Sequence, residues 1–62
     1  MNFTDLIGLS VPDAEQKCKN AGFRMRVIKK DGEELIKTMD HRTDRINVEV
    51  VGGKVTAVDG VG

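Results

Sequence analysis

The chain has 62 residues, with ten basic and ten acidic side chains that cancel. This length predicts one domain, residues 1–62, with a thin core, because folding so short a chain hides only about 60% of its unfolded surface. A net charge of zero argues against nucleic acid or an anionic membrane as a partner. The sequence has no apolar run of about 18 residues that could span a membrane, and its start does not resemble a signal peptide.

A single cysteine, Cys18, rules out an internal disulfide and fits a reducing compartment. We therefore expect a cytoplasmic protein, with secretion as the alternative. The oligomeric state stays open at this point.

The first predicted element is a helix from about Val11 to Asn20. Ser10, followed three residues later by Asp13, resembles a capping box, and Pro12 suits the first helical turn. Apolar residues recur at helical spacing and give the helix one short apolar face. These residues are Val11, Ala14 and Cys18.

Strands are predicted for the rest of the chain. FRMRVIK at 23–29 and RINVEVV at 45–51 alternate apolar and polar residues, which is the period of a half-buried strand. The pair Gly52-Gly53 is a hairpin signal, and KVTAV at 54–58 returns as the antiparallel partner. The sequence therefore predicts an α+β fold in which a helix packs on a small sheet.

A long connection, from about Asp31 to Thr43, separates the first two predicted strands. Connections of this length are uncommon in small domains and are often functional. They are also required where the strands that they join lie parallel. We therefore expect this segment to be presented at the surface.

The polar residues of this segment do not favour catalysis. Cys18 and His41 could form a nucleophile and base, but a free cysteine on an apolar helix face usually acts as a small hydrophobe. Asp40, His41 and Asp44 are a weak pattern for a metal site, because no second histidine or cysteine stands at ligand spacing. We expect a protein that is not an enzyme and that needs no cofactor.

A basic stretch in and just after the first predicted strand leaves nucleic-acid binding as a minor alternative. It contains Arg24, Arg26, Lys29 and Lys30. The chain has only two aromatic residues, both phenylalanine, so a stacking platform for bases is hard to build. A solvated strand face is the favoured interpretation.

The sequence TMDHRTDR at 38–45 instead fits a presented peptide. Met39 is a lone apolar side chain between Thr38 and Asp40. Arg45 stands where the segment joins the next strand and could donate hydrogen bonds to both neighbours of Met39. A loop that is already held in the extended shape that a protease binds loses little further conformational entropy on binding. We therefore interpret the polar residues as a brace made of charge-assisted hydrogen bonds.

Two stretches carry a resemblance to a known family. LIGLSVPDA near the start and TMDHRTDRINVEV with VTAVDGVG near the end resemble the potato inhibitor I family. They also look like a related microbial peptidase-inhibitor family that favours D-x-R-x-D-R-[LI]-N-V. The resemblance implies one helix packed on a small mixed sheet, with a long exposed binding loop between parallel strands. It also implies inhibition of subtilisin-like or chymotrypsin-like serine proteases, to which the loop is offered as a slowly turned-over substrate.

The resemblance assigns roles to particular residues. Met39–Asp40 would be the reactive bond, with Met39 in the main specificity pocket of the protease. The neighbouring loop contacts would be Lys37, Thr38, His41 and Arg42. The loop would be supported by Arg45, Asn47 and Gly62.

Departures from the family pattern leave an alternative open. Asn47 stands where the plant inhibitors carry a second supporting arginine, so the bracing is expected to be weaker or shared with Arg42. The loop between Gly32 and Met39 is about two residues longer, which raises its closure entropy only slightly. Phe3 replaces a core tryptophan. The alternative function keeps the scaffold but uses the loop for a protein partner that is not a protease.

Overall fold

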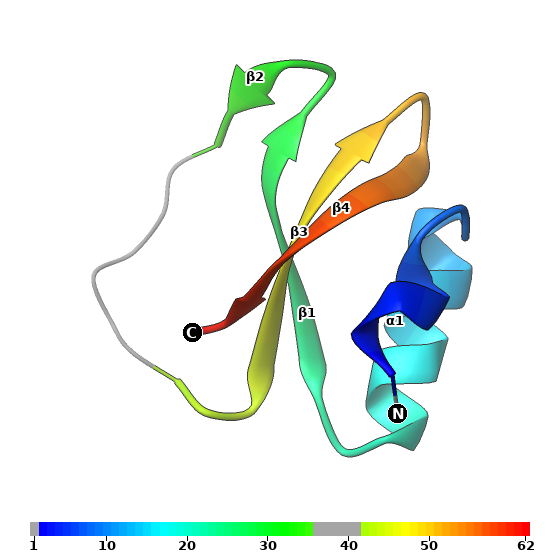
Figure 1. Cartoon of the computed structure of the whole chain (residues 1–62), viewed down its shortest axis with the longest axis vertical. Coiled ribbons are helices and arrows are strands. Elements are labelled where there is room, and N and C mark those ends of the chain that lie inside the picture. Colours follow the sequence, from blue (N-terminus) through cyan, green and yellow to red (C-terminus); the bar gives the residue numbers. More distant parts are fainter. Residues whose placement is uncertain (1, 36–41) are drawn as a thin grey trace.

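The computed structural model describes residues 2–35 and 42–62 (Figure 1). One α-helix packs on a four-stranded mixed sheet with the strand order β2-β1-β3-β4. The predicted α+β fold is confirmed. In chain order the elements are η1 (Phe3–Leu6), α1 (Val11–Asn20), β1 (Arg24–Lys30), β2 (Glu33–Glu34), β3 (Arg45–Val51) and β4 (Lys54–Val61).

Helix α1 has the bounds that the sequence predicts. The Ser10 hydroxyl accepts a hydrogen bond from the Asp13 main-chain N–H at 3.4 Å, which caps the first turn. Ala14 and Cys18 are fully buried on the face that meets the sheet. No helix in residues 2–35 and 42–62 is both long and apolar enough to cross a membrane.

Strands β1 and β3 lie side by side and run parallel, and parallel strands require a long connection such as the one that joins them. Strand β3 covers the predicted residues 45–51. The hairpin to β4 turns at Gly52 and Gly53, whose φ angles of 61° and 77° are the left-handed values that a tight hairpin needs. The predicted topology of these three strands is therefore confirmed.

Strand β4 is longer than predicted and runs to Val61. The prediction from the sequence covers residues 54–58 only. In the structure Val48 pairs with Val58 and Asn47 pairs with Gly60, so Asp59 is the extra residue of a β-bulge. The bulge lets β4 continue until Val61 lies opposite Ile46.

The connection after β1 is also more ordered at its start than predicted. Asp31 and Gly32, with φ angles of 51° and 82°, form a second tight turn. The next two residues form strand β2, which pairs antiparallel with β1. The predicted surface loop therefore does not begin at Asp31, and its central part, residues 36–41, lies outside the described residues.

The core lies on one face of the sheet. Helix α1 and the short η1 cover this face, and the rings of Phe3 and Phe23 meet edge to face with centroids 5.9 Å apart. The buried apolar side chains are Leu6, Ala14, Cys18, Ile46, Val48, Val50 and Val55. Both helices of the described residues lie on this side, so the opposite face of β1 and β3 is left for polar side chains.

Candidate functional site

The polar face of the sheet gathers basic side chains where β1 and β3 begin. Arg24 pairs with Arg45 across the parallel ladder, and Arg26 pairs with Asn47. Residues two apart in a strand point to the same face, so all four side chains share this surface. The end of β4 meets the same place, because Val61 pairs with Ile46. Gly62 therefore lies next to Arg45.

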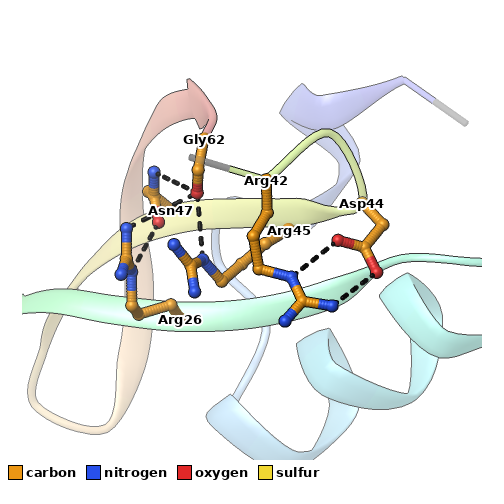
Figure 2. Close-up of polar contacts among 6 residues, drawn as sticks. All are labelled: Arg26, Arg42, Asp44, Arg45, Asn47 and Gly62. Carbon is orange, nitrogen blue, oxygen red and sulfur yellow. Dashed lines mark hydrogen bonds and ion pairs between the residues drawn. The ribbon is translucent and has the colours of Figure 1, made fainter. Parts of the chain in front are cut away.

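The main-chain oxygen of Gly62 is the meeting point of this surface (Figure 2). It accepts a hydrogen bond from Arg45 Nε at 2.9 Å and another from Asn47 Nδ2 at 3.4 Å. Arg26 Nη2 makes a longer contact of 3.5 Å to the same oxygen. In return, the Gly62 N–H donates to the Arg45 main-chain oxygen at 3.0 Å. We call Arg26, Arg45, Asn47 and Gly62 the support cluster.

Asn47 is the buried centre of the support cluster, with only 6% of its surface exposed. Its Oδ1 accepts a hydrogen bond from Arg26 Nε at 2.9 Å, while its Nδ2 donates to Gly62. Leaving a buried polar group without a partner costs about 1–3 kcal/mol, so these two bonds are what make a buried asparagine tolerable. No buried side-chain nitrogen or oxygen lacks a hydrogen-bond partner in the part of the chain that the structure describes.

Arg42 and Asp44 form a fork where the connection returns to the sheet. Arg42 Nε donates to Asp44 Oδ1 at 3.0 Å, and Arg42 Nη2 donates to Oδ2 at 3.3 Å. This hydrogen-bonded guanidinium, with further attraction from Arg24, holds the pKa of Asp44 below its ordinary value. The Asp44 main-chain oxygen accepts from the Arg24 N–H at 2.7 Å, which ties the fork to β1.

The other end of the polar face is acidic. Glu49 lies opposite Lys29 of β1 and close to the bulged Asp59 of β4. The Asp59 carboxyl, through a shared hydrogen bond and through repulsion, raises the pKa of Glu49. The described residues contain no group of three or more histidine, cysteine, aspartate or glutamate side chains that could hold a metal ion.

Cys18 lies away from this surface, in the core between α1 and the sheet. Burial raises the pKa of the Cys18 thiol, and the charge of Glu15 adds to the rise. A raised pKa lowers the fraction of reactive thiolate at neutral pH. Cys18 therefore behaves as a core side chain.

The structure brings together all three predicted support residues, Arg45, Asn47 and Gly62. Arg42 lies to one side of the support cluster and pairs with Asp44 (Figure 2). The predicted reactive bond and most of the predicted loop contacts lie outside the described residues, so they stay predictions. These are Lys37, Thr38, Met39, Asp40 and His41.

Arg26 is the residue of the support cluster that the sequence did not assign to it. In the sequence it belongs to a basic strand face that suggests, at most, nucleic acid. Its place beside Asn47 depends on the register of two parallel strands that are far apart in the chain. The alternation of Arg24 and Arg26 predicts the face on which they lie, but the register comes only from the folded sheet.

Comparison with known proteins adds no family assignment. The chain matches no protein-family model and no curated protein. The resemblance to the potato inhibitor I family therefore stays a prediction made from the residues.

Proposed function

We propose that this protein inhibits serine proteases of the subtilisin or chymotrypsin type. The segment between β2 and β3 would be presented as an extended, substrate-like loop, and Met39–Asp40 would be its reactive bond. The parallel pairing of β1 and β3 supports the proposal, because it requires a connection long enough to be offered to an enzyme.

The observation that carries the proposal is the way in which Arg45 is held. Its guanidinium donates to the Gly62 main-chain oxygen, and its own main-chain oxygen accepts from the Gly62 N–H. Arg45 is the first residue of β3, so this fixed cation stands at the point where the presented segment joins the sheet. A donor fixed before binding can restrain the carbonyl and hydroxyl groups of the segment without further ordering cost.

In this proposal the chain works as a substrate that is released slowly. The Met39 side chain fills the apolar pocket of the protease, and Thr38 and Asp40 accept hydrogen bonds from Arg45. If the bond between Met39 and Asp40 is cut, the brace keeps both new ends close together, which favours reclosure over release. Tight binding and slow net cleavage then have the same cause.

The experiment is an inhibition titration of subtilisin and chymotrypsin, followed by mass spectrometry of the mixture. We expect stoichiometric inhibition and one slow cut after Met39. Met39→Gly should weaken binding by at least about 2 kcal/mol, the scale of an interface hot spot. The control is Leu35→Gly, which removes an exposed apolar side chain from the same connection and should leave inhibition intact.

Equal inhibition by wild type and Met39→Gly would remove Met39 from its role. An absence of inhibition by the wild-type protein, with rapid cutting at several bonds of the segment, would contradict the proposed function. That outcome would favour a loop used for a partner that is not a protease. The presence of Asn47 in place of a second supporting arginine is the observation that keeps this alternative open.

We also propose that the protein acts in the cytoplasm. The support is its single cysteine, which is free and buried, so the fold does not depend on an oxidising compartment. Cell fractionation tests this: recovery in the cytosolic fraction is expected, and recovery outside the cell would contradict it.

A further inference from the structure

Arg26 comes from β1, yet it contacts Gly62, which holds Arg45, and Asn47, which holds Gly62. Its Nε donates to Asn47 Oδ1 at 2.9 Å, and its Nη2 lies 3.5 Å from the Gly62 main-chain oxygen. The side chain is partly buried and spans the ladder between register partners. Figure 2 shows it reaching from β1 toward Asn47 and Gly62. This geometry differs from that of an ordinary solvated arginine on a strand.

The contact with Arg26 helps to fix which way the Asn47 amide points. A guanidinium can only donate, so the oxygen of the amide must face Arg26 and the nitrogen must face Gly62. The reversed amide would set two donors against each other at Arg26 and two acceptors against each other at Gly62. Because Asn47 is almost fully buried, water cannot satisfy the reversed arrangement. Arg26 and the Gly62 oxygen together therefore select the orientation in which Asn47 holds Gly62.

Gly62 in turn holds Arg45, through one hydrogen bond in each direction. The contacts thus form a chain from Arg26 to Asn47, from Asn47 to Gly62, and from Gly62 to Arg45. Replacing the first member should loosen the last, although Arg26 and Arg45 belong to different strands.

We propose that Arg26 is a positioning residue of the inhibitor and supplies from β1 the second supporting guanidinium that β3 lacks at Asn47. This inference rests on the proposed function. The role of Arg26 explains how an asparagine can stand at position 47 of the support cluster. Arg26 and Asn47 are neighbours in the ladder, so a guanidinium from β1 reaches the Gly62 oxygen that Asn47 also contacts. Arg26 and Asn47 together restrain the Gly62 oxygen, as one longer side chain on β3 would do alone.

The first test is the rate at which subtilisin cuts the bond after Met39, measured for matched variants. Arg26→Ala should be cut faster by about tenfold, the change expected from losing hydrogen bonds at a buried partner. Arg24→Ala removes the same charge from the same face of β1 and should stay within about twofold of wild type. An exchange variant, Arg26→Asn with Asn47→Arg, returns the guanidinium from β3 and should recover most of the resistance.

Fold loss and loss of positioning are separated by measuring urea unfolding of each variant. The inference predicts that the cutting rate of Arg26→Ala rises under conditions in which the variant stays folded. Equal cutting rates for folded Arg26→Ala and Arg24→Ala would overturn it. Failure of the exchange variant to recover resistance, while it remains folded, would also count against it.

A second readout does not depend on a protease. In a ¹H–¹⁵N NMR spectrum, the Arg45 Nε–H and the Asn47 side-chain amide protons should be protected from exchange with water in the wild-type protein. Arg26→Ala should remove that protection, and Arg24→Ala should keep it. If the wild-type protein inhibits nothing, the proposed function fails, yet this spectrum still decides whether Arg26 positions Arg45. Unchanged protection in Arg26→Ala would overturn the inference on its own.

Discussion

The two faces of β3 hold the molecule together in different ways. Ile46, Val48 and Val50 point to one face, where η1 and α1 bury them almost completely. The opposite face of the same strand carries Arg45, Asn47 and Glu49. The apolar face contributes burial, which is strong but has no direction, whereas the polar face contributes hydrogen bonds, which are weaker but fix atoms in place.

The difference shows where a small domain can hold polar side chains in fixed positions. With so little core available, stability depends on a few apolar residues of alternating position. The residues between them are then free to restrain the end of β4 and the return of the connection to the sheet. Substitutions on the two faces, one residue apart in the sequence, should therefore change the stability by different amounts and for different physical reasons.

The largest expected effect is on the apolar face. Ile46→Ala removes a fully buried side chain between Arg45 and Asn47 and should lower the free energy of unfolding by about 2–5 kcal/mol. Urea denaturation measures this directly. A loss below about 1 kcal/mol would mean that the core does not depend on this position in the way that its burial implies.

The polar face should respond next, at Asn47. Asn47→Ala leaves Arg26 Nε and the Gly62 oxygen each without one of their partners, at an expected cost of about 1–3 kcal/mol in unfolding free energy. The control is Asn20→Ala, which removes an exposed asparagine that accepts one hydrogen bond from Gln16. Equal losses in the two variants would show that burial of Asn47 adds nothing to the strength of its bonds.

The acidic end of the polar face should gain stability when a charge is removed. The pKa of Glu49 is raised by Asp59 above its ordinary value of 4.5, so the folded state binds the Glu49 proton more tightly than the unfolded state does. The tighter proton binding stabilises the folded state in acid, and this stabilisation is lost as the pH rises through the raised pKa. Glu49→Gln should therefore be more stable than wild type at pH 7, and the difference should vanish well below pH 4.5.

A variant at the basic end should show the opposite sign and a small effect. The pKa of Asp44 is lowered by Arg42 below its ordinary value of 3.8, so the ionised carboxylate stabilises the folded state at neutral pH. That contribution is lost as the pH falls from 3.8 through the lowered pKa. Asp44→Asn should be slightly less stable than wild type at pH 7 and equal to it in strong acid. Thermal unfolding across this pH range measures the stability of both the Glu49→Gln and the Asp44→Asn variant. If Asp44→Asn were more stable than wild type at pH 7, the stabilising role of the Arg42–Asp44 pair would be contradicted.

Local signals in the sequence were enough for much of the fold. Ser10 and Pro12 mark the start of α1, and the alternation from Arg45 to Val51 gives β3 and both of its faces. The length of β4 could not be predicted, because its bulge at Asp59 depends on pairing with β3. Strand β2 was missed because two glutamates form a strand there only by pairing with β1.

The support cluster was predictable only in part, for the same reason. The resemblance pointed to Arg45, Asn47 and Gly62, which the structure brings together. Arg26 needed the register of β1 against β3, which is a property of the whole sheet. A partner on a strand that is joined by a long crossover therefore could not be found from the sequence alone.

The proposed function depends most on a fixed Arg45 that braces the segment between β2 and β3. The most direct test is the rate at which subtilisin cuts after Met39 in wild type and in Arg45→Ala, measured under conditions in which urea unfolding shows both proteins folded. We expect Arg45→Ala to be cut faster by about tenfold or more, because a restraining donor has been lost. A folded Arg45→Ala that is cut no faster than wild type would contradict it.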